Sequence, residues 1–516
     1  MKENNEIKIG AILSYIIIGL NMVVGIAYTP ILTNMLGQSE YGLYSLVNTI
    51  MSYLTILDLG FGNAIIIYTT KYKNAGDKEK ENKLHGMFLI IYTIIGIVAT
   101  LLGIILYLNT EKVFSNSMSI SEIATAKKLI LILTFNMAIT FPFSIFSSII
   151  TAYEKFIFAK VLNIVRIILM PAIMIPLLFL GYKSVALVIV LTILNIGVLL
   201  SNFIYCKKKL SIKMNFKNMD RKLLVEIFCF SFWIFLNTIV YKLNWSVDEF
   251  ILGTVSGTVS VAIYSVANQL HTIYSSFAEC ISNILLPKVT KMEANYATDE
   301  EYSNIFIRVG RLQFFVMALI LSGFVIYGNE FITKCWVGEQ YADSYIIACI
   351  LMIPLFVPLI QNVGLNILQV KNKYKYRTIV CLIIAVVNVI ISIPLAMKLG
   401  GIGSAIGTAL SMFVGQVIIM NWYYWKKIKL DIPRFWKNIF ILSIPLIGVM
   451  IIGILIKNIL EIKGILTLGI NITIYVSIYA AFMYKFVMNK DEKNMVSKPI
   501  KKIINKFYRV RNKVEN

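Results

Sequence analysis

Residues 84–108 have the sequence LHGMFLIIYTIIGIVATLLGIILYL, which contains no aspartate, glutamate, lysine or arginine. A helix of this length extends about 38 Å, which exceeds the roughly 30 Å of hydrocarbon in a bilayer. Across the 516 residues, 58% are hydrophobic and 15% are charged, and the mean hydropathy is +0.76. Soluble domains carry about 25% charged residues. The composition therefore argues against a water-soluble enzyme and predicts an all-α, polytopic membrane protein.

Apolar runs of this kind, bounded by charged or turn residues, occur fourteen times and predict about 14 transmembrane helices. At about 20 residues each they would use about 280 residues, so the connecting segments must be short. The predicted spans are 9–33, 40–67, 84–108, 128–151, 161–181, 184–206, 224–254, 258–285, 312–328, 344–370, 378–397, 402–425, 438–456 and 465–488.

Lysines and arginines are distributed unevenly between the two sides that these spans define. If both termini are cytoplasmic, the inner segments carry 38 of the 49 basic residues and the outer segments carry eight. Such an excess is the positive-inside pattern, so the sequence predicts cytoplasmic termini. The formal net charge of +22 is then explained by membrane orientation and contact with membrane lipids. No nucleic-acid partner is expected.

An internal repeat relates residues that lie 220 positions apart. Identical residues fall at 31–32 and 251–252, 37 and 257, 44–45 and 264–265, and 48 and 268. Spans one to six thus resemble spans seven to twelve, and six spans per half predict two bundles related by an axis along the membrane normal. A cavity between two such bundles is what alternating access requires, so the sequence predicts a transporter.

The repeat also predicts how the chain is divided. We expect an N-terminal six-helix bundle at 1–222, a C-terminal six-helix bundle at 223–437, two additional transmembrane helices at 438–488, and a basic cytoplasmic tail at 489–516.

Motifs that hold nucleotides, metals or catalytic nucleophiles are missing from the sequence. It contains no Gly-x-x-x-x-Gly-Lys-[Ser/Thr], no His-Glu-x-x-His and no Gly-x-Ser-x-Gly. Its six cysteines form no Cys-x-x-Cys pair. We therefore expect no cofactor, no metal centre and no enzymatic activity. The energy for transport must come from an ion gradient, the membrane potential, or consumption of the cargo on the far side.

Two short motifs resemble a known family of membrane proteins. Residues 36–44 (LGQSEYGLY) and 57–62 (LDLGFG) are similar to the opening of bacterial polysaccharide or oligosaccharide flippases, and 248–253 (DEFILG) with 263–267 (IYSVA) repeat the signature in weaker form. The resemblance implies two six-helix bundles that move a lipid-linked oligosaccharide across the cytoplasmic membrane for cell-surface polysaccharide biosynthesis. A polyprenyl diphosphate carrier and polysaccharide polymerase or transferase partners are implied with it.

Two basic residues within spans are candidates for binding an anionic substrate. A charge at mid-membrane costs about 2.5–3.5 kcal/mol, so each basic residue must contact water, pair with an acid or bind a ligand. The repeat aligns Lys242 with Met22, near the middle of span seven. Arg166 lies about five residues into span five from the cytoplasmic side. We expect Lys242 to attract a diphosphate, whereas Arg166 either does the same or extends back to the headgroups.

Four acids and one histidine within spans are candidates for ion coupling or for structural roles. The repeat places Asp58 opposite position 278, directly before Glu279, so the two halves hold acids at similar depth. His271 lies two turns before Glu279. Asp248 and Glu249 follow Lys242 by about two turns and could form an internal ion pair with it.

Two alternatives to a flippase remain open from the sequence. A multidrug or cation antiporter of the same superfamily would have an acidic cavity, which the basic residues within spans disfavour. A membrane-bound polysaccharide polymerase would need a sizeable catalytic loop, yet the longest predicted outer loop, near 109–126, is short.

Overall fold

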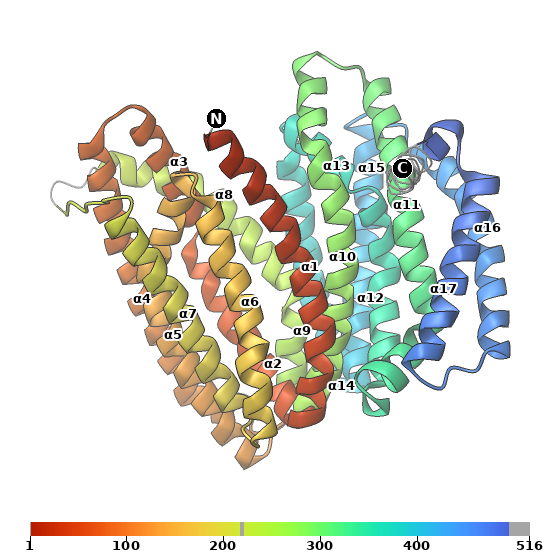
Figure 1. Ribbon diagram of the computed structural model, residues 1–516, viewed down its shortest axis with the longest axis horizontal. Helices are drawn as coiled ribbons and strands as arrows, with labels where there is room; N and C mark the ends of the chain where they lie inside the picture. Colours follow the sequence, from red (N-terminus) through yellow and green to blue (C-terminus); the bar gives the residue numbers. More distant parts are fainter. Residues whose placement is uncertain (1, 217–220, 495–516) are drawn as a thin grey trace, which may run out of the picture. The chain divides into compact units, whose positions relative to one another are not determined.

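The structure is a computed structural model that describes residues 2–216 and 221–494. All regular secondary structure in these residues is helical, as predicted (Figure 1). Contacts divide the chain into two compact units, unit 1 (Met1–Gln269 and Cys381–Thr408) and unit 2 (Leu270–Val380 and Ala409–Asn516). Most of the predicted basic tail, residues 495–516, lies outside the described residues. The four-part division expected from the repeat stays a prediction.

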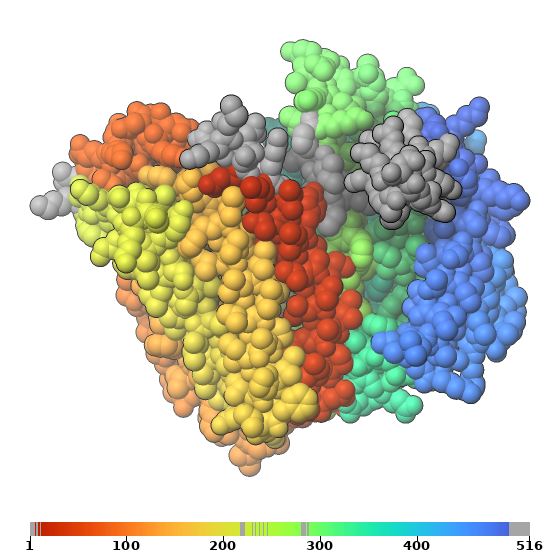
Figure 2. All heavy atoms as spheres, in the orientation of Figure 1, coloured from red at the N-terminus to blue at the C-terminus, as the bar shows by residue number. Residues whose placement is uncertain are grey.

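Unit 1 is built around α5, which packs against both α4 and α7, while α1 packs along α6. Figure 2 shows α6 at the surface of this unit. The helices of unit 1 are α1 (Lys2–Leu36), α2 (Gln38–Leu54), the 3₁₀ helix η1 (Thr55–Asp58), α3 (Phe61–Asn74), α4 (Lys78–Phe114), α5 (Ile120–Ala152), α6 (Phe156–Phe179), α7 (Ser184–Lys208), α8 (Arg221–Trp245), α9 (Val247–Val255), and parts of α10 (Gly257–Ala294) and α14 (Tyr374–Met412).

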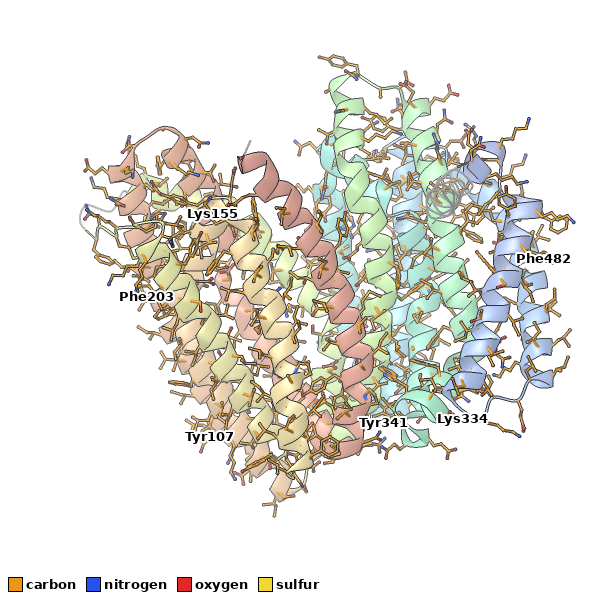
Figure 3. All side chains as sticks on the ribbon, in the orientation of Figure 1. Tyr107, Lys155, Phe203, Lys334, Tyr341 and Phe482 are labelled. Atoms are coloured by element: carbon orange, nitrogen blue, oxygen red, sulfur yellow. The ribbon has the colours of Figure 1, made fainter. Side chains whose placement is uncertain are left out.

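The helices of unit 1 place the turn at Lys155, which is predicted to be an inner segment, and Tyr107, next to the predicted outer end of span three, at opposite ends. Figure 3 shows Lys155, in the turn between α5 and α6, near one end of these helices and Tyr107 of α4 toward the other. Lys155 also forms an ion pair of 3.1 Å with Glu6 of α1. The turn and the start of α1 are therefore held at the same end of unit 1, as expected for two inner segments.

Unit 2 is organised around α11, which packs against α12, α16 and α17. Its elements are the remaining parts of α10 and α14, α11 (Asp299–Glu330), the π-helix η2 (Phe331–Trp336), the 3₁₀ helix η3 (Glu339–Tyr341), α12 (Asp343–Ile360), α13 (Val363–Val370), the π-helix η4 (Phe413–Ile419), α15 (Met420–Lys426), α16 (Ile432–Ile459), α17 (Ile465–Phe482) and the π-helix η5 (Met483–Val487).

Twelve helical segments in the described part of the chain are long and apolar enough to cross a membrane. One of them, Tyr374–Lys426, has 53 residues and would extend about 80 Å, far more than one crossing needs. It is broken at Gly400, whose φ is 57° and ψ is −135°, so it accommodates the two spans predicted at 378–397 and 402–425. The span predicted at 258–285 lies on α10. The chain is a polytopic, all-α membrane protein, as its sequence predicts.

A buried ion pair in unit 2 joins α11 to the segment after the last span. The Nε of Arg311 donates to Glu492 Oε1 at 2.7 Å, and its Nη2 donates to Oε2 at 2.9 Å. The two side chains are only 11% and 4% exposed. A second donor–acceptor contact, from Arg311 to Asn438 of α16, measures 3.2 Å. Arg311 thus fixes the end of the helical region to the core of unit 2.

We expect Glu492→Ala to lower the free energy of unfolding by about 3–5 kcal/mol, because it leaves the Arg311 guanidinium buried without its counter-charge. Thermal unfolding in detergent, followed by size-exclusion chromatography, measures the loss. The matched control is Glu79→Ala, which breaks the exposed 2.6 Å ion pair with Lys83 and should change stability by less than about 1 kcal/mol. Equal losses in the two variants would contradict a structural role for the Arg311 pair.

Candidate functional site

The candidate site lies where span seven is broken. Helix α8 ends at Trp245 and α9 begins at Val247, and the intervening Ser246 has φ −123° and ψ −14°. Asp248 and Glu249 occupy the first turn of α9 and are only 2% and 5% exposed. The N-terminal end of a helix carries partial positive charge, which favours acids in this position. The break therefore allows two adjacent carboxylates to be buried within a span.

Asp248 is surrounded by hydroxyl groups from α10 and α14. Its Oδ1 accepts a hydrogen bond from Ser404 at 2.6 Å. Its Oδ2 accepts from the Tyr264 hydroxyl and from Thr408, both at 2.8 Å. All four side chains are buried and belong to unit 1. Within the described ranges, neither Asp248 nor Glu249 forms an ion pair.

The hydroxyl groups near Asp248 have more neighbouring acceptor oxygens than protons to donate to them. Thr408 Oγ1 lies 2.8 Å from Asp248 Oδ2 and 3.0 Å from Asn388 Oδ1, but a hydroxyl has one proton to donate. Ser392 also donates to Asn388 Oδ1, at 2.8 Å. Carboxylate, amide and hydroxyl oxygens are the ligands that hard cations prefer. The residues of this group, which we call the Asp248 cluster, are Asp248, Tyr264, Asn388, Ser392, Ser404 and Thr408. Their chemistry fits a bound proton or a small monovalent cation.

Glu249 shares α10 with Asp248 but bonds to α2 where Asp248 bonds to α14. Its Oε2 accepts from the hydroxyl of Thr49 on α2, and its Oε1 accepts from the amide of Asn268 on α10 at 3.3 Å. Adjacent residues on a helix point about 100° apart, which explains how two neighbouring acids reach separate partners. Glu249 thus links α9 to α2, whereas Asp248 links α9 to α14.

Helices α2 and α10 touch at positions that the sequence repeat relates. Ser45 and Ser265, which are 220 residues apart, have hydroxyl oxygens 2.6 Å from each other. A Cβ atom on Gly42 would lie 1.8 Å from the Thr258 carbonyl oxygen, so only glycine allows this approach. Nearby, Glu122 Oε1 accepts from both Ser39 and Thr258 at 2.6 Å. We call the contact at Gly42, Ser45, Thr258 and Ser265 the α2–α10 contact.

Asp58 lies at a second helix break, away from the Asp248 cluster. It ends η1, and the next two residues, Leu59 and Gly60, have φ of 50° and 76° before α3 begins. Its carboxylate accepts a hydrogen bond from the Tyr92 hydroxyl at 2.6 Å and from the backbone amides of Gly60 and Gly62. These partners support the structural alternative for Asp58.

The two predicted substrate-binding residues, Lys242 and Arg166, form no ion pair within residues 2–216 and 221–494. Lys242 is half-buried on α8, and its ammonium makes neither an ion pair nor a hydrogen bond with the residues that the structure describes. The alternative of an internal ion pair with Asp248 or Glu249 is therefore not formed among the described residues. Arg166 is exposed on α6 beside Val165 and Ile168, which are 44% and 49% exposed. Both residues lie in unit 1.

The remaining predicted residues lie in unit 2, on the second part of α10. His271 is buried and Glu279 is exposed. Asp248 and Glu249, by contrast, are buried in unit 1. The structure thus groups the five ion-coupling candidates into one buried pair at the break in span seven, one acid at the break in span two, and two residues in unit 2.

Residues 8–293 match the family model described as polysaccharide biosynthesis protein. The chain belongs to this family. A proposed O-antigen transporter of Shigella flexneri is 23% identical over 404 residues, which are 75% of this chain and 90% of that protein. The capsular polysaccharide biosynthesis protein CapF of Staphylococcus aureus is 26% identical over 229 residues, covering 43% of this chain and 55% of CapF.

Solved structures of transporters share the fold of this polysaccharide biosynthesis family member. The lipid II flippase MurJ in an inward closed conformation has a TM-score of 0.67 and 18% identity, and covers 93% of this chain and 98% of that chain. An inward-facing multidrug resistance MATE family transporter of the MOP superfamily has a TM-score of 0.59 and 15% identity, and covers 79% of this chain and 98% of that chain. The family model confirms the predicted resemblance to polysaccharide biosynthesis proteins, and these solved structures show that the chain has a transporter fold.

Sequence reasoning missed the partners of Asp248 in this family member. Ser404 and Thr408 belong to no recognised motif, so sequence analysis assigns their hydroxyl groups no role. One signal was available, because Asn388 and Ser392 are four residues apart, and so are Ser404 and Thr408. Polar pairs at this spacing lie on one helix face, which is unusual in spans that are otherwise apolar.

We expect Ser45→Cys with Ser265→Cys, in a protein whose six native cysteines are replaced, to form a disulfide under mild oxidation. The two hydroxyl oxygens lie 2.6 Å apart, and a disulfide needs Cβ atoms about 3.5–4.5 Å apart. Mobility on a non-reducing gel measures the yield. Ser45→Cys with Ser260→Cys is the control, because Ser260 lies about 140° around α10 from Ser265. Equal yields from both pairs would contradict the α2–α10 contact.

Proposed function

We propose that this multi-pass membrane protein is a flippase that moves a lipid-diphosphate-linked oligosaccharide, chemically unchanged, across the bacterial cytoplasmic membrane for cell-surface polysaccharide biosynthesis. The family match, the O-antigen transporter relative and the flippase-type fold support a transporter of polysaccharide precursors. The observation that carries the finer assignment is the ammonium of Lys242, which lies within a span and forms no ion pair with the described residues.

Lys242 supplies the charge that a diphosphate carrier needs. A half-buried cation in a low-dielectric environment attracts an anion more strongly than an exposed one does. Because no carboxylate neutralises Lys242 among the described residues, its charge is available to a ligand. Arg166, exposed among apolar side chains on α6, is the second residue that we assign to the diphosphate.

The cargo enters from the cytoplasmic side, where both termini lie in this proposal. The diphosphate then meets Lys242 and Arg166, the sugars occupy polar surroundings within the protein, and the polyprenyl chain remains among the membrane lipids. The product is a lipid-linked oligosaccharide on the outer face. A polymerase or transferase must consume it there, since translocation leaves the glycan unchanged.

We further propose that the flippase works by alternating access and is coupled to a cation or proton at Asp248. Burying a carboxylate without a counter-charge is costly, and hydroxyl donors alone offset only part of that cost. A proton or a small cation on Asp248 removes the unfavourable charge, and the cluster has oxygen atoms to coordinate it. Glu249 is likewise a buried carboxylate that forms no ion pair with the described residues. Asp58, Glu279 and His271 are secondary candidates for coupling.

A drug or cation antiporter is the second candidate function. The buried pair Asp248 and Glu249, which forms no ion pair in the part of the chain that the structure describes, favours it, because an antiporter also needs a titratable or cation-binding acid within its spans. Its fold would be the same, since a MATE family transporter resembles this chain. The two functions differ in cargo, which Lys242 distinguishes: an unpaired cation favours an anionic cargo over a cationic drug.

We expect Lys242→Ala to reduce translocation of a lipid-diphosphate-linked oligosaccharide at least about tenfold, because a hydrogen bond to a charged group contributes about 1.5–3 kcal/mol. Lys242→Arg keeps the charge and should retain most of the rate. The measurement is movement of intact cargo between leaflets of proteoliposomes of known orientation. Lys398→Ala, at an exposed lysine, is the control. Undiminished transport by Lys242→Ala would remove this assignment, and a chemically altered glycan would instead indicate an enzyme.

We expect Asp248→Asn to make the residual transport rate insensitive to imposed Na⁺ and pH gradients, because a neutral amide neither takes up a proton nor supplies the charge that holds a cation. The parent protein should respond to one of the two gradients. Asp77→Asn is the control, since Asp77 is a partly exposed residue that caps the start of α4, away from the Asp248 cluster, and its pKa is lowered by the Lys80 side chain. A gradient response that survives in Asp248→Asn would place coupling elsewhere.

A further inference from the structure

Glu249 lies where a change in the charge of Asp248 can alter its hydrogen bond to another helix. The two acids are consecutive in the first turn of α9, yet Asp248 bonds to α10 and α14 while Glu249 bonds to α2 and α10. Neither has a basic partner within the described ranges. A change of charge on Asp248 therefore alters the electrostatic energy of the Glu249 carboxylate, because the two groups are adjacent and little water screens them.

Helix α2 offers Glu249 two hydroxyl groups, of which one is in use. Thr49 donates to Glu249, whereas the hydroxyl of Tyr53 is buried and has no hydrogen-bond partner among the described residues. Tyr53 is close enough to Asp248 and Glu249 to interact electrostatically with both. Thr49 and Tyr53 are four residues apart, so they lie on the same face of α2, one turn from each other.

A buried hydroxyl without a partner has lost its bonds to water, which makes the arrangement of Tyr53 among the described residues unfavourable. Moving α2 by one turn would bring Tyr53 to the place of Thr49. One-turn displacements of about 5.4 Å between packed helices are a known form of two-state transition. The same displacement would separate Ser45 from Ser265 and open the α2–α10 contact.

We propose that Glu249 is a positioning residue that transmits occupancy of the Asp248 cluster to α2, by exchanging the hydroxyl of Thr49 for that of Tyr53. The inference rests on the proposed coupling role of Asp248. With Asp248 neutralised, Glu249 keeps its bonds to Thr49 and Asn268 and the α2–α10 contact stays closed. When the proton or cation leaves, repulsion between the adjacent carboxylates increases. Glu249 then favours the more acidic phenol hydroxyl of Tyr53, and the contact opens.

The test uses the fraction of Ser45→Cys/Ser265→Cys protein that is cross-linked after a fixed exposure to oxidant, in membrane vesicles and without substrate. Thr49→Val removes the partner used in the closed arrangement and should lower this fraction. Tyr53→Phe removes the partner used in the open arrangement and should raise it. Asp248→Asn mimics neutralisation and should also raise it. Each shift should correspond to about two- to tenfold in the ratio of cross-linked to free protein.

The decisive comparison repeats these variants with Glu249→Gln, where all three effects should disappear because the residue that carries them has lost its charge. Thr49→Ser, which keeps a hydroxyl, should behave like the parent, and so should Thr55→Val, at an exposed threonine beyond α2. Variants are compared only when they elute from size exclusion as the parent does. The proposal is overturned if Thr49→Val and Tyr53→Phe shift the fraction in the same direction, or if the Asp248→Asn effect persists with Glu249→Gln.

This test is independent of the cargo. Opposite shifts in a protein that moves no lipid-linked oligosaccharide would support the role of Glu249 and reject the substrate assignment. Normal transport of lipid-linked oligosaccharide without opposite shifts in the cross-linked fraction would support the substrate assignment and reject the role of Glu249.

Discussion

Two carboxylates, buried side by side with no ion pair among the described residues, constrain the rest of this structure. Charged groups removed from water must be neutralised, paired or hydrogen-bonded, and the donors that Asp248 and Glu249 receive from the described residues are hydroxyl and amide groups. Satisfying them requires a broken helix, whose free N-terminal end faces the acids, and three further helices that bring donors to the break. The arrangement of α2, α9, α10 and α14 in unit 1 meets this requirement.

The close contact between α2 and α10 follows from small residues at repeat-related positions. Gly42 allows the backbones to approach, and Ser45 and Ser265 bond to each other across the contact. Two helices of equivalent origin thus meet at equivalent points, within reach of Glu249. A contact made of a glycine and single hydroxyl pairs is held by few interactions, which suits a contact that must open and close during transport.

The two helix breaks in unit 1 hold acids in different circumstances. At Asp58 the carboxylate accepts backbone amides and a tyrosine hydroxyl, so it completes a turn. At Asp248 the donors are side-chain hydroxyls, which rotate and can present lone pairs instead of protons. The first arrangement is suited to a fixed structure, and the second can exchange a proton or cation. The same residue type therefore serves different purposes, because one site uses backbone donors and the other uses side chains.

The sequence by itself determined the class of protein. Uncharged runs such as 84–108 are long enough to cross a bilayer, and backbone groups in lipid must be bonded within a helix, so an all-α polytopic fold followed from composition alone. The repeat and the motifs at 36–44 and 57–62 indicated the family. Lys242 and Asp248 were identifiable as candidates because ionisable residues are costly within spans.

Only the tertiary structure decided which of these residues act together. Asp248 meets Ser404 and Thr408, which lie more than 150 residues away, and Glu249 meets Thr49 200 residues earlier. Sequence spacing reports neighbours along one helix, but it does not report which faces of different helices meet. It left open whether Lys242 pairs with Asp248, whereas in the described residues the break at Ser246 brings Asp248 other donors and Lys242 forms no ion pair. The hydrophobic pattern of each span is set by contact with lipid, so it can be recognised along the sequence. The Asp248 cluster forms only where distant segments pack together, so only the tertiary structure identifies it.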